Sequence, residues 1–127
     1  MKLKKKTIKS SAIVIVIIIA LGFAMNTIMF KADPTKLELA QCLTEKNVKM
    51  YGAFWCGACT TQKELFGPAF KAIDYVECDE RGQDAQPEVC QVAGISGYPT
   101  WEINGQKSTG VKPLESLAAS AGCEYQG

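Results

Sequence analysis

A charged start followed by a long apolar run is the feature that most constrains this chain of 127 residues. Five lysines lie within residues 1–10, and residues 12–30 are apolar except for Asn26 and Thr27. A helix of about 20 apolar residues matches the thickness of the bilayer hydrocarbon. No polar face interrupts the run, so a small domain could not bury it on every side. We therefore predict a basic cytoplasmic flank over 1–10 and a transmembrane signal-anchor helix over 11–30.

The same segment predicts the side of the membrane on which the rest of the chain lies. By the positive-inside rule the lysine cluster remains in the cytoplasm, so a single-pass protein would carry its C-terminal part on the periplasmic or extracellular side. A cleaved signal peptide is the alternative, with Ala20-Leu21-Gly22 as a weak cleavage pattern. Either interpretation exports the remainder, which has room for one small domain. We place that domain at 36–127, after a linker at 31–35.

Composition narrows the chemistry of the exported domain. The net charge is +1 and much of the positive charge belongs to the first ten residues, so no basic face for nucleic acid is expected. The chain has six cysteines and no histidine. In so short a chain this favours disulfide chemistry in an oxidising compartment or a thiolate-rich metal site.

Periodicity and turn signals predict alternating helices and strands after the apolar run. Asp33 followed by Pro34 is typical of a helix start, and Asn104-Gly105 suits the type I′ turn of a β-hairpin. The predicted helices cover 34–46, 57–65, a continuation over 69–73 after a break at Gly67-Pro68, 87–94 and 113–121, and the predicted strands cover 48–54, 75–78, 100–103 and 106–109. This order predicts a single α/β domain without internal repeats.

Cys56 and Cys59 lie where a buried strand is predicted to pass into a helix. The partial positive charge of a helix N-terminus favours a thiolate at Cys56, and Cys59, one turn later, can close a disulfide or resolve a mixed disulfide. A structural disulfide, half of a zinc site and coincidence are the alternatives. A zinc site would need a second C-x-x-C or paired histidines, which the sequence lacks. A structural disulfide between residues three positions apart would remove little loop-closure entropy from the unfolded chain. Redox chemistry explains the pair better, with no metal and no bound cofactor besides the redox-active disulfide.

Two motifs in this order resemble the thioredoxin superfamily. Residues 54–59, Phe-Trp-Cys-Gly-Ala-Cys, are similar to its active-site strand and helix start, and residues 94–100, Gly-Ile-Ser-Gly-Tyr-Pro-Thr, are similar to its cis-proline loop. The resemblance implies a thioredoxin-like fold, a central mixed sheet flanked by helices. It also implies a cis peptide between Tyr98 and Pro99 that faces the cysteine pair.

Aromatic residues beside these motifs have two possible roles, because such side chains fill cores more often than they contact substrate. We expect Trp55 and Tyr98, together with Pro99, to contact substrate. Phe54 and Trp101 are assigned to packing.

A narrower resemblance concerns the thioredoxin-like domain fused to bacterial and plant vitamin K epoxide reductase homologues. It is carried by residues 50–56, 62–67, 75–78 and 97–101. It implies an enzyme that oxidises the thiols of exported proteins, and a separate membrane protein of the vitamin K epoxide reductase type that reoxidises the pair through quinone. A reversed electron flow, giving a reductase or isomerase as in cytochrome c maturation, and a non-enzymatic binding module are the alternatives.

The other cysteines and two charged residues complete the predictions. The resemblance implies a structural disulfide between Cys78 and Cys90. Six cysteines allow 15 connectivities, so a second disulfide between Cys42 and Cys123 competes with free thiols and with a link between chains. Position 50 is Met where classical thioredoxins place a buried acid that serves the second cysteine, and Gly and Ala occupy the positions between the cysteines. Glu77 or Lys63 could substitute for that acid, but a solvated surface position is the expected role of each.

Overall fold

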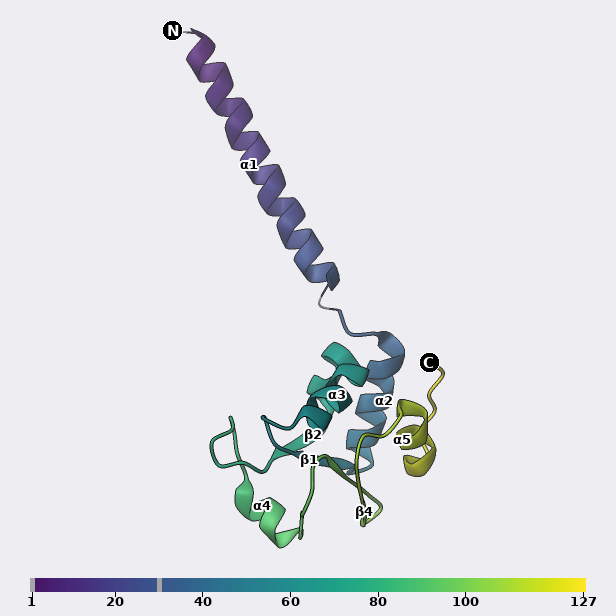
Figure 1. Cartoon of the computed structure of the whole chain (residues 1–127). Helices are drawn as coiled ribbons and strands as arrows, with labels where there is room; N and C mark the ends of the chain where they lie inside the picture. The colour runs from purple at the N-terminus through teal and green to yellow at the C-terminus, as the bar shows by residue number, and fades with distance from the viewer. Residues whose placement is uncertain (1, 30) are drawn as a thin grey trace. The chain divides into compact units, whose positions relative to one another are not determined.

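The computed structural model describes the backbone of residues 2–29 and 31–127 and the side chains of residues 10–26 and 31–127. The chain divides into two compact units, residues 1–31 and residues 32–127. The first unit is the helix α1 (Lys2–Met29), and the second contains every other helix and strand (Figure 1).

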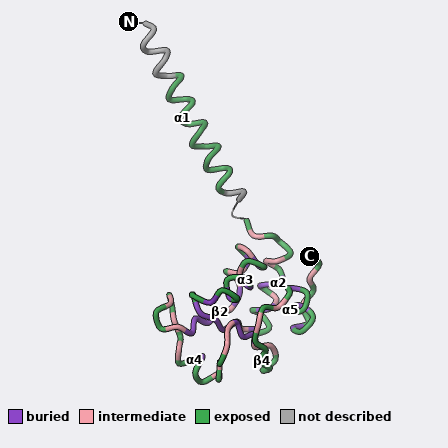
Figure 2. The backbone as a smooth tube through the Cα atoms, viewed as in Figure 1, coloured by how far each residue is buried: buried purple, intermediate pink, exposed green. Residues whose placement is uncertain are grey.

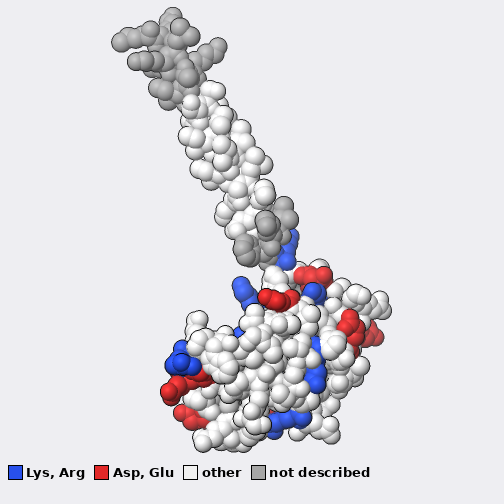
Figure 3. All heavy atoms as spheres, in the orientation of Figure 1, with Lys and Arg blue, Asp and Glu red and all other residues white. Residues whose placement is uncertain are grey.

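Helix α1 exposes its described side chains. Its large apolar side chains from Ile13 to Met25 are 51–72% exposed, and residues 10–26 carry no charge (Figures 2 and 3). Within the described residues, no helix combines the length and the hydropathy that crossing a membrane requires. The transmembrane helix predicted over 11–30, and with it a single-pass location, is therefore not supported by these residues. The side chains of the predicted flank at 1–9, and those of 27–30, lie outside the described part.

The second unit is built on one mixed sheet of four strands, β1 (Lys49–Gly52), β2 (Asp74–Glu77), β3 (Thr100–Ile103) and β4 (Gln106–Thr109). The strand order is β2-β1-β3-β4, with β1 parallel to β2 and the other neighbours antiparallel. The helical elements are α2 (Pro34–Glu45), α3 (Gly57–Phe66), the 3₁₀ helix η1 (Gly67–Ala72), α4 (Pro87–Val92) and α5 (Leu114–Ala121). This mixed sheet with flanking helices fits the predicted thioredoxin-like α/β fold.

Local sequence explains several of the boundaries. Asp33 caps α2 by accepting the backbone N–H of Thr35 at 2.9 Å. Gly67, at φ 57°, ends α3 and leads into η1. Asn104 and Gly105 both have positive φ, as a type I′ turn requires. The predicted helix starts at Pro34, Gly57 and Pro87 and the predicted hairpin are thus confirmed. The 3₁₀ helix η1 includes Gly67 and Pro68, where a break was predicted, and β1 is shorter than the predicted strand 48–54.

Alternating residues of β1 belong to two separate cores on the two faces of the sheet. Met50 and Trp101 pack with apolar residues of α2, α3 and α5. Tyr51 and Val76 pack with Cys78 and Cys90, beside α4. Figure 1 accordingly shows α4 apart from the other helices of this unit. The cysteine pair at the start of α3 is held by the larger of the two cores.

Two disulfides link the ends and the middle of this unit. Cys42 in α2 is bonded to Cys123 beyond α5, 81 residues later, with the Cα atoms 6.1 Å apart. Cys78, which follows β2, is bonded to Cys90 in α4, with the Cα atoms 5.7 Å apart. Both pairs are those named from the sequence, and together they leave Cys56 and Cys59 as free thiols.

Candidate active site

Cys56 is the N-cap residue of α3, and Cys59 lies one turn into that helix. The sulfur of Cys56 accepts the backbone N–H of Cys59 at 3.1 Å. The N-terminal end of the helix thus directs a backbone N–H and its positive partial charge at this sulfur. Cys56 is 8% exposed and Cys59 is fully buried. Cys56 is therefore the sulfur that a substrate reaches first.

The two thiols differ in their electrostatic surroundings. Burial, followed by a hydrogen bond with Cys56, raises the pKa of Cys59 to about 12, against the weaker opposing effects of the Ala53 backbone and the Lys63 charge. Cys59 therefore keeps its proton at physiological pH. It can act as a nucleophile only if another group takes that proton.

Aromatic side chains flank the pair on the exposed side. Trp55 is 58% exposed, donates its indole N–H to Asp79 at 2.7 Å, and meets Tyr98 edge-on with ring centroids 6.0 Å apart. Phe54 is 52% exposed, with the Arg81 guanidinium 5.7 Å from its ring centre. The prediction that Phe54 packs in the core is wrong, because β1 ends at Gly52 and the chain turns outward before α3.

The loop before β3 is fixed by hydrogen bonds on both sides of its proline. The Tyr98–Pro99 peptide is cis, and the Pro99 side chain is fully buried. The carbonyl of Pro99 accepts the N–H of Gly110 at 2.8 Å. The hydroxyl of Thr100 donates to the Gly97 carbonyl at 2.7 Å. Of the three residues expected to contact substrate, Trp55 and Tyr98 pack against each other, whereas Pro99 is buried and its carbonyl is bound by Gly110.

Gln62 is a supporting residue that the sequence prediction missed. Its side chain is fully buried on α3, and its amide oxygen accepts the indole N–H of Trp101 at 3.1 Å and the backbone N–H of Lys112 at 2.7 Å. Its amide nitrogen donates to the Lys112 carbonyl at 3.0 Å. Gln62 shares the buried face of α3 with Cys59 and Phe66, at helical spacing, and this spacing is the signal that could have identified it. It fixes α3, and hence the cysteines, against β3.

Glu77 and Lys63 are also placed differently from the prediction. Glu77 is only 4% exposed, because the loop after β2 folds back and brings Gly82 directly against its side chain. The amino group of Lys63 lies 3.9 Å from the ring centre of Tyr75. Neither residue is simply a solvated surface charge, and both approach Tyr75 beneath the cysteine pair.

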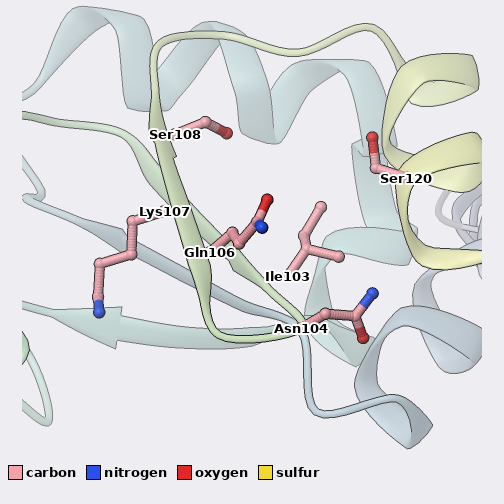
Figure 4. A pocket seen from close by; sticks show the side chains of 6 residues that line it. All are labelled: Ile103, Asn104, Gln106, Lys107, Ser108 and Ser120. Carbon is pink, nitrogen blue, oxygen red and sulfur yellow. The ribbon is translucent and has the colours of Figure 1, made fainter.

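Other candidate sites lack these features. In the part of the chain with described side chains, no three or more His, Cys, Asp or Glu residues are grouped to hold a metal ion. A hollow between the β3–β4 hairpin and α5 contains no cysteine and no aromatic side chain (Figure 4). It is lined by Ile103, Asn104, Gln106, Lys107, Ser108 and Ser120.

Comparison with known proteins adds the similarity of a curated relative to this geometry. No family model matches the chain. The chain is similar to the thiol-disulfide oxidoreductase LTO1 of Arabidopsis thaliana, with 39% identity over 108 residues. The match covers 82% of this chain but only 29% of the plant protein, so the chain spans less than a third of that relative's length. This similarity and the paired cysteines are the two observations on which a proposal of thiol-disulfide exchange can rest.

Proposed function

We propose that the chain is a thiol-disulfide oxidoreductase that oxidises the thiols of exported proteins through Cys56 and Cys59. The observation that carries the proposal is the pair itself. Cys56 lies at the N-cap of α3 with its sulfur on the Cys59 N–H, while all four other cysteines are joined in disulfides away from this helix. A free dithiol in that position is suited to exchange rather than to structural bonding.

The cycle conserves electrons through two exchange steps. A substrate thiolate attacks the Cys56 sulfur of the oxidised pair, and Cys59 leaves as a thiolate that takes up a proton. A second substrate thiolate then attacks the mixed disulfide, which releases the substrate disulfide and returns Cys56 as a thiolate. The exposed rings of Phe54 and Trp55 beside Cys56 offer apolar contact to an unfolded substrate chain.

The reduction potential of the Cys56–Cys59 pair tests the direction of electron transfer. For an oxidase we expect about −120 to −180 mV in equilibrium with glutathione, because a donor of disulfides must be more oxidising than its substrates. The measurement is made on the full chain in detergent, with the Cys78–Cys90 pair followed separately. A value near about −270 mV would support the reductase instead, and a pair that does not cycle would leave only a binding module.

We propose further that residues 1–31 tether the enzyme to a membrane, with the domain on the extracytoplasmic side. In support, the apolar side chains from Ile13 to Met25 are exposed around the whole helix, and five lysines precede them. Leaving so much apolar surface in water is unfavourable by about 25 cal/mol per Å², so a lipid environment stabilises it. The lysine flank sets the orientation.

Replacing Ile17 and Ile18 together by lysine tests the tether. We expect the full chain to sediment with membranes and the I17K/I18K variant to move to the soluble fraction, because each central charge costs about 2.5–3.5 kcal/mol of insertion free energy. The matched control is Val92→Lys, which places a lysine in α4 where the valine is 90% exposed. This variant should stay with the membrane. Equal sedimentation of all three proteins in alkaline carbonate, or an equal loss, would contradict the tether.

A membrane partner is proposed to restore the disulfide. The oxidised pair gains two electrons from substrate in each cycle, and these must pass to an acceptor. The resemblance to domains fused with vitamin K epoxide reductase homologues supports a separate quinone-linked membrane protein of that type. A mixed disulfide between Cys56 and such a protein, isolated on non-reducing gels, would identify it.

A further inference from the structure

Cys59 poses a problem that its own contacts do not solve. It is fully buried, so no solvent base reaches its thiol directly. Any exchange in which Cys59 attacks the Cys56 sulfur must first remove the Cys59 proton, and the reverse exchange must return it. The residue at position 50 of β1 is an apolar Met, which cannot serve as that base.

A buried carboxylate lies on the neighbouring strand. Glu77 of β2 is 4% exposed, and no Lys or Arg of the described residues forms an ion pair with it. One carboxylate oxygen accepts the hydroxyl of Tyr75 at 2.8 Å, and the other accepts the backbone N–H of Asp79 at 3.0 Å. A glutamate is seldom buried to this extent without a cation, and its hydrogen bond with Tyr75 makes it a candidate for a functional role.

Tyr75 connects this carboxylate to the cysteine through the space above Gly52. A Cβ atom placed on Gly52 would lie 3.0 Å from the Cys59 sulfur and 3.1 Å from the Tyr75 hydroxyl oxygen. The sulfur and the hydroxyl therefore border the same small space, which exists only because position 52 has no side chain. Gly52 is also the register partner of Glu77 in the parallel β1–β2 pair.

We propose that Tyr75 and Glu77 form a proton relay for the Cys59 thiol, an inference that rests on the proposed exchange function. When Cys59 resolves a mixed disulfide, its thiol proton passes to the Tyr75 oxygen, directly or through one water, while the Tyr75 proton passes to the Glu77 carboxylate. The Cys59 thiolate then attacks the Cys56 sulfur, the Cys56–substrate bond breaks, and the substrate sulfur leaves with the electron pair. In the oxidising direction the same proton returns from Glu77 to Cys59.

The surroundings suit a relay rather than a permanent charge on Tyr75. Burial, and then the hydrogen bond with Glu77, raises the pKa of Tyr75, so its hydroxyl stays neutral. In the relay this hydroxyl accepts a proton from Cys59 as it donates its own proton to Glu77. Besides Glu77, the charged or titratable groups that face Tyr75 are the thiols of Cys56 and Cys59 and the amino group of Lys63, which lies over the Tyr75 ring. Lys63 favours a thiolate at Cys59 and so supports transfer toward Glu77.

Reaction of the reduced full chain with 4,4′-dithiodipyridine separates the two cysteines. Attack by Cys56 releases the first thiopyridone, and attack by Cys59 on the resulting mixed disulfide releases the second. In Glu77→Gln and in Tyr75→Phe we expect the second phase to slow about tenfold to a hundredfold at neutral pH, with the first phase changed less than about twofold. The second phase should recover as pH rises, because hydroxide that enters during local opening of the fold can remove the Cys59 proton in place of the relay. The double variant should be no slower than the slower single variant.

The control variant is Glu80→Gln, which removes an exposed carboxylate three positions along the chain and should leave both phases unchanged. An unchanged second phase in both relay variants, or equal slowing of both phases at every pH, would overturn the relay. Loss of the second phase in the unmodified chain would instead contradict the proposed exchange function. The two failures are therefore distinguishable in one experiment.

Discussion

Replacing Cys59 by serine should turn the enzyme into a trap that accumulates mixed disulfides with exported proteins. The reason is the asymmetry of the pair, in which Cys56 is the accessible sulfur at the helix N-terminus and Cys59 is the buried thiol that can attack Cys56 and displace a bound substrate. Without Cys59, a disulfide formed at Cys56 has no internal nucleophile to release it. Non-reducing gels of the full chain, purified after acid quenching of its thiols, measure the trapped species.

Cys56→Ser is the matched control for that experiment. It removes the attacking sulfur and should abolish both the trapped species and thiol exchange, by about a thousandfold or more, as expected for loss of a nucleophile. A reducing second dimension then separates exported substrates from a membrane partner. If Cys56→Ser retained exchange, or if Cys59→Ser trapped nothing, the binding module would replace the oxidoreductase as the better interpretation.

Local signals predicted much of this fold because the features concerned depend on neighbouring residues. The N-cap at Asp33 and the hairpin turn at Asn104-Gly105 follow from side-chain and backbone preferences within a few positions. The helix start at Cys56 is local in the same sense, since its sulfur accepts an N–H three residues later. Such features need no knowledge of the rest of the molecule.

The predictions that failed concern residues whose surroundings come from distant parts of the chain. Glu77 reads as a surface charge at the end of a strand, and only the return of the loop with Gly82 buries it. Phe54 continues the apolar pattern of β1, yet the strand has already ended at Gly52 and the ring is exposed. Gln62 has a polar side chain on a buried helical face, and its hydrogen-bonding partners lie 39 and 50 positions away. Burial and partners of this kind are fixed by tertiary packing.

Removing the Cys42–Cys123 disulfide should lower the free energy of unfolding more than removing the Cys78–Cys90 disulfide. The first closes a loop between residues 81 positions apart and the second between residues 12 positions apart. On the chain-entropy model these bonds contribute about 4.5 and about 3 kcal/mol, a large part of the roughly 5–15 kcal/mol that stabilises a small domain. Urea unfolding of the paired alanine variants, C42A/C123A and C78A/C90A, in the full chain measures both losses.

The two variants should also differ in thiol exchange, and this separates stability from function. Cys78 directly follows Glu77, and its disulfide ties the start of the following loop to α4. Gly82 of that loop covers the Glu77 side chain. C78A/C90A should therefore slow the Cys59 phase of exchange even where the domain remains folded. The Cys42–Cys123 disulfide joins no part of that loop. The C42A/C123A variant should therefore leave both phases of exchange unchanged below its unfolding transition. A larger stability loss in C78A/C90A would show that local packing at Cys78 outweighs loop closure. Equal exchange rates in the two variants would show that the loop does not support the relay.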